Sequence, residues 1–73
     1  GKPSPDIYFE AAKRLAVLPG HCLVFEDVTA GITAGKCAGM KVCAIEDVYS
    51  AHQKQKKQAL ADFYIEDYTQ IKL

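Results

Sequence analysis

One stretch decides the fold: LVFEDVTAG, residues Leu23–Gly31. An apolar run from Cys22 to Phe25 leads into it and predicts a short strand. Because apolar and polar side chains do not alternate in this run, we expect the strand to be covered on both faces. The run stops at two adjacent carboxylates, Glu26 and Asp27. Open α/β sheets place their chemistry at the carboxyl ends of such strands, so this turn is the first candidate for a functional site.

A helix is expected directly after the two acids, over about Ala30–Ala38. Thr29 is a suitable N-cap residue for it, since a threonine hydroxyl can accept a hydrogen bond from the first helical turn. Gly31 and Gly35 are four residues apart, which places them on one helix face and indicates close approach to another backbone. Gly39 suits the position just past the end of this helix.

The segment before the first strand predicts another helix, over about Pro5–Ala16. Ser4 is a suitable N-cap, and Pro5 suits the first helical position, where a missing N–H group costs nothing. Ile7, Ala11 and Leu15 recur at four-residue spacing with Tyr8 and Ala12 beside them, and we expect this apolar face to lie toward a sheet. The pair Pro19-Gly20 then turns the chain toward the strand.

Two further strands follow, at about Lys41–Ile45 and Phe63–Ile65. Between them we expect a surface helix over about Ala51–Leu60, capped by Ser50 and polar on most faces. A short turn or helix over Tyr68–Leu73 ends the chain. This alternation of helices and strands, joined by short loops, predicts an α/β fold with a parallel sheet and right-handed crossovers.

The composition excludes several classes of protein. The 73 residues form one small domain at most, and nine basic residues balance nine acidic ones, so we expect no nucleic-acid partner and no membrane partner. We do not expect the segment after Gly1 to be a signal peptide, and no apolar run is long enough to cross a bilayer. The only methionine is Met40, which suggests that the chain begins inside a longer parent.

The three cysteines are Cys22, Cys37 and Cys43, an odd number with no C-x-x-C pair. We interpret them as reduced, buried thiols, which favours a cytoplasmic protein. A zinc site that used Cys22 and His21 would need further ligands at close spacing, and the sequence has none there.

Two groups of residues have the chemistry of a phosphate or metal site. Glu26 and Asp27 could converge beyond the end of the strand and hold Mg²⁺, which takes one or two carboxylates together with waters and phosphate oxygens. The alternative is that they only solvate a loop. Lys2 lies in a loop stiffened by Pro3 and Pro5, which could hold its ammonium over a phosphate or a carboxylate. The alternative is an ordinary exposed lysine.

The other polar residues have simpler interpretations. Glu46 and Asp47 also follow a strand, and we expect a solvated loop there. The lysines of the third helix could bind an anion, but we interpret them as a solvated helix face. His21 and His52 are isolated, and the tyrosines are interpreted as packing residues: Tyr8, Tyr49, Tyr64 and Tyr68.

Together the two motifs resemble those of a known family. GKPSPDIY, residues 1–8, resembles the lysine loop of the haloacid dehalogenase (HAD) superfamily, and most closely that of the β-phosphoglucomutase-like phosphatases and mutases. FEDVTAGI, residues 25–32, with AGM at residues 38–40, resembles the acidic metal-binding motif of the same subgroup. The resemblance covers nearly the whole chain. It implies that residues 1–73 are the C-terminal portion of a Rossmann-like, HAD-type core domain.

The resemblance also implies roles for individual residues. Lys2 would neutralise charge on a nucleophilic aspartate and on the transferring phosphoryl group. Asp27 would bind Mg²⁺ directly, and Glu26 would bind it directly or support a ligand. Val28 departs from the small polar residue often found there in relatives. The substrate would be a phosphorylated small molecule such as a sugar phosphate, and the parent a Mg²⁺-dependent phosphatase or phosphosugar mutase that works through an aspartyl-phosphate.

The family's nucleophile motif, Asp-x-Asp-Gly, does not occur in this sequence, and neither does a segment for the cap domain. We therefore expect this chain to be inactive on its own. An alternative is a non-catalytic binding or complementing module, which associates through its exposed sheet edge with the missing N-terminal part or with a second copy. A further alternative is a degenerate relative without an enzymatic role.

Overall fold

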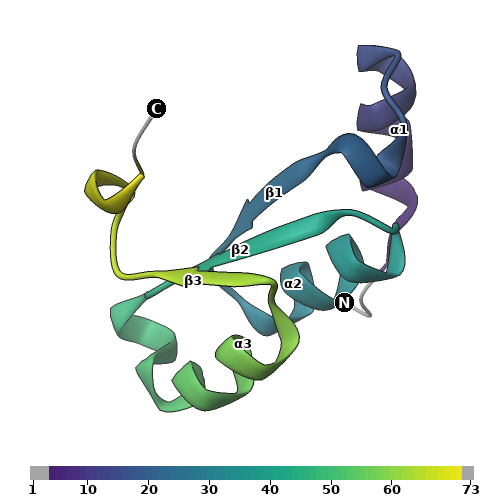
Figure 1. The fold of residues 1–73 in the computed structure, drawn as a ribbon. Coiled ribbons are helices and arrows are strands. Elements are labelled where there is room, and N and C mark those ends of the chain that lie inside the picture. The colour runs from purple at the N-terminus through teal and green to yellow at the C-terminus, as the bar shows by residue number, and fades with distance from the viewer. Residues whose placement is uncertain (1–3, 72–73) are drawn as a thin grey trace.

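Helices and strands alternate along the chain, as expected from the sequence (Figure 1). The computed structural model describes residues 4–71, with only the backbone at residues 48–50. The α-helices of this part are α1 (Asp6–Leu15), α2 (Thr29–Cys37) and α3 (Lys54–Leu60). Its strands are β1 (Leu23–Glu26), β2 (Lys41–Ile45) and β3 (Phe63–Ile65). Short 3-10 turns complete it: η1 (Pro19–His21), η2 (Val48–Gln53) and η3 (Tyr68–Gln70).

The three strands form one parallel sheet in the order β1-β2-β3. Glu26 lies opposite Ala44 in the first pair, and Ile45 lies opposite Ile65 in the second. The predicted α/β fold with a parallel sheet is therefore confirmed. All three strands run in one direction, so their carboxyl ends share one edge of the sheet.

The core lies between the sheet and helices α2 and α3, which lie below it in the view of Figure 1. Ile32 of α2 packs there on Val42 and Ala44 of β2, and none of the three is exposed to solvent. A smaller cluster joins α1 to the end of α2 and the start of β2, through Ala12 and Met40. These clusters pack α2 against both β1 and β2.

Two glycines allow α2 to pack and to end as it does. A Cβ atom on Gly35 would lie 2.8 Å from Cγ2 of Val42, so the helix could not come as close to β2 with any other residue there. The predicted close approach is confirmed, although it is to a side chain rather than to a backbone. Gly39 has φ of +79°, the left-handed conformation that follows many helix ends, as predicted.

The opposite face of the sheet is largely open, and the prediction that the first strand is covered on both faces is wrong. Side-chain exposure alternates along β1, with Leu23 at 51% and Phe25 at 38%. Phe63 of β3 is 54% exposed, and the ring of Tyr68 lies 5.9 Å from that of Phe25. The reason is topological. The strands follow one another in sequence order, so successive crossovers of the same hand place α2 and α3 on the same face.

Helix α1 buries only part of its predicted apolar face. Ile7 and Leu15 are 74% and 71% exposed, whereas Ala12 is buried and Tyr8 is half-buried. This helix precedes the first strand and is not part of a crossover, so only its Tyr8–Ala12 side reaches the sheet and α2. The predicted helix is confirmed, and so are the burial of Ala12 and the partial burial of Tyr8 on its apolar face, but the expected burial of Ile7 and Leu15 is not.

The helix starts differ from prediction by a few residues. Pro5 rather than Ser4 is the N-cap of α1, and Ser4 Oγ accepts a 3.4 Å hydrogen bond from Asp6 N. Thr29 is the first residue of α2 and makes no capping bond, because Val28 occupies the N-cap position. The third helix begins as the 3-10 turn η2 and becomes α-helical only at Lys54. Local propensity therefore located these helices but not their first turns.

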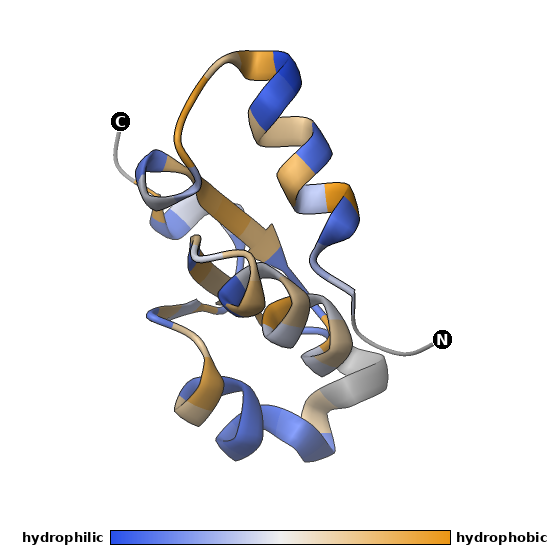
Figure 2. Cartoon of the chain, turned by 90° about the vertical axis from the view of Figure 1, so that its right-hand side faces the viewer, coloured by the Kyte–Doolittle hydropathy of each residue, from blue (hydrophilic) through white to orange (hydrophobic). Residues whose placement is uncertain are grey.

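One lysine of α3 contradicts the prediction of a solvated helix face. The helix is hydrophilic along most of its length (Figure 2), yet Lys57 is only 1% exposed. The apolar residues near the end of this helix, Ala59 and Leu60, are exposed. Across residues 4–71, none of the helices combines the length and the apolar character that crossing a bilayer requires.

Candidate functional site

The candidate site lies at the carboxyl edge of the sheet, where β1 ends and α2 begins. Glu26 is the last residue of β1 and is half-buried, on the face that α2 covers. Asp27 follows beyond the end of the strand and is exposed. The two predicted metal-binding acids therefore differ: Asp27 is accessible from solvent, whereas Glu26 is held against the protein.

Two neighbours hold the Glu26 carboxylate in place. The Tyr8 hydroxyl donates a hydrogen bond to Glu26 Oε1 and also lies 3.4 Å from the carbonyl oxygen of Gly31. On the other side, a Cβ atom on residue 31 would lie within 3.0 Å of the Glu26 carboxylate. Gly31 is therefore required for a different reason from Gly35: its missing side chain leaves the space that the carboxylate fills.

The contact between Tyr8 and Glu26 also affects the tyrosine. Burial, together with the hydrogen bond and the negative charge of Glu26, raises the pKa of Tyr8 to about 12. The hydroxyl therefore stays protonated and can donate throughout the physiological range. The sequence suggested only a packing role for Tyr8, because the hydrogen bond joins residues that are 18 positions apart.

This hydrogen bond connects the two sequence motifs. Tyr8 lies in the first turns of α1, directly after the proline-containing segment, and Glu26 lies in the acidic motif. Lys2, the predicted catalytic residue, lies outside the described residues. The helix that follows it is nonetheless held onto the acidic turn.

The backbone of Asp27 is bonded as well. Its carbonyl oxygen accepts a 2.6 Å hydrogen bond from Nζ of Lys57, which donates another 2.6 Å bond to the carbonyl oxygen of Ile45 at the end of β2. The only local signal for this contact is a lysine near the end of a polar helix, which is too common a pattern to predict it. Lys57 thus reaches the candidate site from α3, 30 residues further along the chain.

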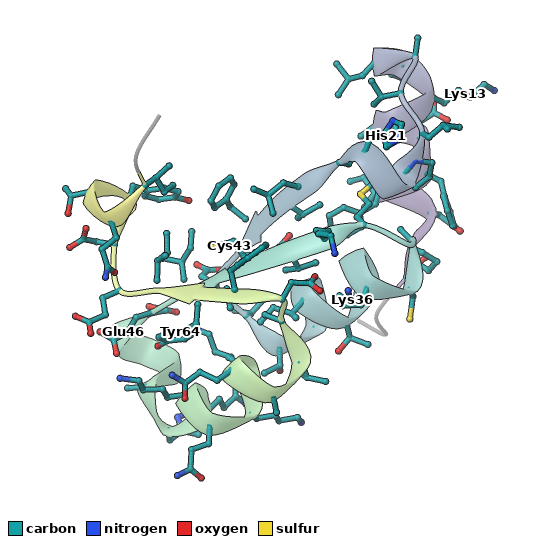
Figure 3. The ribbon with its side chains drawn as sticks, viewed as in Figure 1. Lys13, His21, Lys36, Cys43, Glu46 and Tyr64 are labelled. Carbon is teal, nitrogen blue, oxygen red and sulfur yellow. The ribbon has the colours of Figure 1, made fainter. Side chains whose placement is uncertain are left out.

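The second acidic pair has its own partners. Glu46 Oε1 lies 3.6 Å from Nζ of Lys54 and accepts a 3.4 Å hydrogen bond from the Tyr64 hydroxyl (Figure 3). The Lys54 ammonium also lies 5.6 Å from the centre of the Tyr64 ring. Burial and the nearby Glu46 charge raise the pKa of Tyr64. Glu46 and Asp47 are half-buried rather than fully solvated, so the prediction of a solvated loop holds only in part.

The donor set at the edge of the sheet fits Mg²⁺ as a partial site. Among residues 4–71, no group of three or more histidine, cysteine, aspartate or glutamate side chains could hold a metal ion. Magnesium commonly binds through one or two carboxylates and completes its octahedron with waters and substrate phosphates. Asp27 and Glu26 supply that number of carboxylates.

His21, Cys22 and Cys37 lie away from this edge of the sheet, because His21 and Cys22 precede β1 and Cys37 ends α2. His21 lies in η1, at the α1 end of the molecule (Figure 3). Cys43 is buried and burial raises the pKa of its thiol, whereas Cys37 is exposed, which differs from the prediction of three buried thiols. All three cysteines are free, as expected.

Fold and site together define an α/β protein with a Rossmann-like parallel sheet and an acidic turn at the carboxyl edge of that sheet. A family model of haloacid dehalogenase-like hydrolases matches residues 1–39. The chain therefore belongs to the haloacid dehalogenase-like hydrolase family, and its resemblance to the β-phosphoglucomutase-like members is confirmed by the relatives that follow.

Two curated relatives match part of the chain. The chain is 62% identical over 45 residues to the bifunctional riboflavin kinase/FMN phosphatase of Arabidopsis thaliana. This match covers 62% of the chain and 12% of the relative. The chain is 55% identical over 40 residues to the β-phosphoglucomutase of Bacillus subtilis, and that match covers 55% of the chain and 18% of the relative.

A solved structure shares the fold over almost the whole chain. CbbY from Rhodobacter sphaeroides, solved in complex with xylulose-(1,5)bisphosphate, superposes with a TM-score of 0.83 at 33% sequence identity. The match covers 94% of this chain and 29% of CbbY. The chain thus spans less than a third of the length of each of these three relatives.

Proposed function

We propose that this chain supplies the lysine-loop and acidic-motif portion of a Mg²⁺-dependent phosphatase or phosphosugar mutase. One observation carries the proposal: Tyr8 bonds Glu26 and so holds the helix behind the lysine loop against the acidic turn. In this arrangement Lys2 would supply positive charge, while Asp27 and Glu26 would supply the carboxylates, all near the carboxyl edge of the sheet.

The two carboxylates would have different roles in binding the metal. Asp27 is exposed at the end of β1 and would bind the metal directly. Glu26 has one oxygen engaged by Tyr8, which fixes its orientation, so it would bind through its other oxygen or through a water. Bound Mg²⁺ would offset negative charge on a transferring phosphoryl group, which is much of what phosphoryl transfer requires. The Lys2 ammonium would add to this charge compensation.

The proposed substrate is a phosphorylated small molecule, with sugar phosphates as the first class to test. The support comes from the relatives, one named for a phosphoglucomutase activity and one solved with a sugar bisphosphate. Because the chain spans less than a third of their length, we propose that it does not turn over substrate alone and acts as part of a longer parent.

The metal proposal is tested by titrating the chain with MgCl₂ and following backbone amide shifts. We expect Asp27→Asn to weaken Mg²⁺ binding at least about 10-fold, with a smaller loss for Glu26→Gln. Asp6→Asn is the matched control, since Asp6 is an exposed aspartate in the first turn of α1. Equal affinity in Asp27→Asn and Asp6→Asn would refute the assignment of Asp27 as a ligand. Mg²⁺-dependent hydrolysis of p-nitrophenyl phosphate by the pure chain would refute its proposed inactivity.

The second candidate is a binding or complementing module, favoured by the open face of the sheet. Leu23, Phe25 and Phe63 are all more than a third exposed there, and β1 and β3 are the edge strands. Exposed apolar surface of this kind favours association with a further protein segment or a second copy. Sedimentation velocity tests it: we expect Phe63→Ser to reduce self-association. A chain that is monomeric at every concentration tested would count against this candidate.

A further inference from the structure

Lys57 is a buried charge that the proposed catalytic role does not use. Among the side chains whose exposure the structure describes, it is the one charged group that is buried, at 1% exposure. A lysine is rarely buried to this degree, because removing an ammonium from water costs on the order of several kcal/mol. Such a group persists where hydrogen bonds replace the lost water.

Two of the bonds that Lys57 makes are at the edge of the sheet where β1 and β2 end. Its Nζ donates to the carbonyl oxygens of Asp27 and Ile45, both at 2.6 Å. In a parallel sheet, carbonyl groups near the strand ends run out of partners in the ladder. An ammonium has three N–H donors, so one Lys57 side chain can serve both strand ends at once.

The Asp27 turn is thereby held at three points. On the strand side, Glu26 keeps register with Ala44 of β2. On the helix side, Val28 O accepts a 3.1 Å hydrogen bond from Ile32 N, the first bond of α2. Between them, Lys57 fixes the carbonyl of Asp27 itself. The peptide group between Asp27 and Val28 is therefore oriented before any metal binds.

We propose that Lys57 is a positioning residue for the Asp27 carboxylate: its ammonium ties the Asp27 carbonyl to the end of β2 and so preorganises the turn from which the carboxylate extends. The expected effect of Lys57 on Mg²⁺ binding rests on the function proposed above, whereas its expected effect on the order of the turn does not. Packing alone does not account for the ammonium, because a methionine of similar length would fill the space without a buried charge.

The test compares Lys57→Met with Lys56→Met. Lys56 is exposed on the same helix, so the control removes the same charge one residue away. The first readout needs no metal: ¹⁵N relaxation order parameters of the Val28 and Thr29 amides. We expect them to fall from about 0.85 toward about 0.6 in Lys57→Met, and to stay unchanged in Lys56→Met. The second readout is the Mg²⁺ titration, where Lys57→Met should weaken binding about 10-fold or more, the range typical of groups that orient metal ligands.

The two readouts separate the two proposals. If the turn loses order in Lys57→Met and the unsubstituted chain does not bind Mg²⁺, the role of Lys57 is supported and the metal site is refuted. If the unsubstituted chain binds Mg²⁺, and Lys57→Met keeps both an ordered turn and the same Mg²⁺ affinity, only the role of Lys57 is overturned.

A measurement on the unsubstituted chain covers the case in which Lys57→Met does not fold. Scalar couplings across hydrogen bonds, from ¹⁵Nζ of Lys57 to the carbonyl carbons of Asp27 and Ile45, report the two bonds directly. We expect both couplings, together with a shift of the Lys57 ¹⁵Nζ resonance that follows the Asp27 amide through the Mg²⁺ titration. A Lys57 ammonium that shows neither coupling would overturn the proposal.

Discussion

Replacing Gly31 by alanine tests whether Glu26 lies where the site requires it. A Cβ atom on residue 31 would fall within 3.0 Å of the Glu26 carboxylate, so the carboxylate would have to move. It cannot move without loss, because the Tyr8 hydroxyl bonds it on its other side. Gly31→Ala should therefore displace Glu26 and break that hydrogen bond.

Two opposing effects set the size of the change. Alanine is favoured over glycine within a helix by up to about 1 kcal/mol. A hydrogen bond to a charged group contributes about 1.5–3 kcal/mol to stability. Loss of the hydrogen bond outweighs the gain in helix propensity, so Gly31→Ala should destabilise the folded chain by about 0.5–2 kcal/mol. Helix propensity alone predicts the opposite direction.

Urea unfolding followed by circular dichroism measures this in a double-mutant cycle with Tyr8→Phe. When the hydroxyl is already absent, the carboxylate can swing aside, so Gly31→Ala should be neutral or stabilising by up to about 1 kcal/mol. Gly20→Ala is the control, because a Cβ atom on Gly20 would have no neighbour within 4 Å. If Gly31→Ala stabilises the unsubstituted chain by about 1 kcal/mol, the reasoning about Glu26 is refuted.

Two further predictions concern the core and the response to acid. Ile32→Ala should lower the free energy of unfolding by about 2–5 kcal/mol, because Ile32 is fully buried. Ile7→Ala should change it by less than about 0.5 kcal/mol, because Ile7 is exposed. If urea unfolding shows a similar loss of stability in both variants, the orientation of α1 is contradicted. The Lys36 ammonium, 2.9 Å away, and Val42 N both bond the Asp62 carboxylate and lower its pKa below the ordinary 3.8. Its contribution to stability is therefore present above the unfolded-state pKa and is lost as the pH falls through the folded-state value. Asp62→Asn should remove that part of the acid sensitivity. If the free energy of unfolding falls equally steeply with decreasing pH in Asp62→Asn and in the unsubstituted chain, this role of Asp62 is ruled out.

The order and type of the elements follow from local sequence. The strand at Lys41–Ile45 and the strand at Phe63–Ile65 have the predicted bounds, and Gly39 ends α2 as predicted. Apolar runs, turn residues and left-handed glycines act within a few positions of themselves, so a single sequence shows them. The first turns of the helices were less well predicted, because caps such as Thr29 compete with neighbours of similar propensity.

The two acids of the candidate site were also located from sequence, because adjacent carboxylates after an apolar run are a local signal. The difference between them was not. Glu26 is turned toward α2 and bonded by Tyr8, whereas Asp27 is exposed, and that division depends on where α1 docks. The lysines of α3 show the same limit, since helical periodicity cannot tell which of several lysines meets the ends of two strands.

The sequence by itself therefore determined an alternating α/β chain, its parallel sheet and the position of an acidic turn at a strand end, all of which depend on neighbours in the chain. Only the tertiary structure decided which face of the sheet is covered, which side of α1 is buried and which groups hold the acidic turn. Those groups are Tyr8, 18 residues from Glu26, and Lys57, 30 residues from Asp27. The physical reason is that hydrogen bonds and buried contacts over such separations exist only once the crossovers have brought the strand ends and helices together.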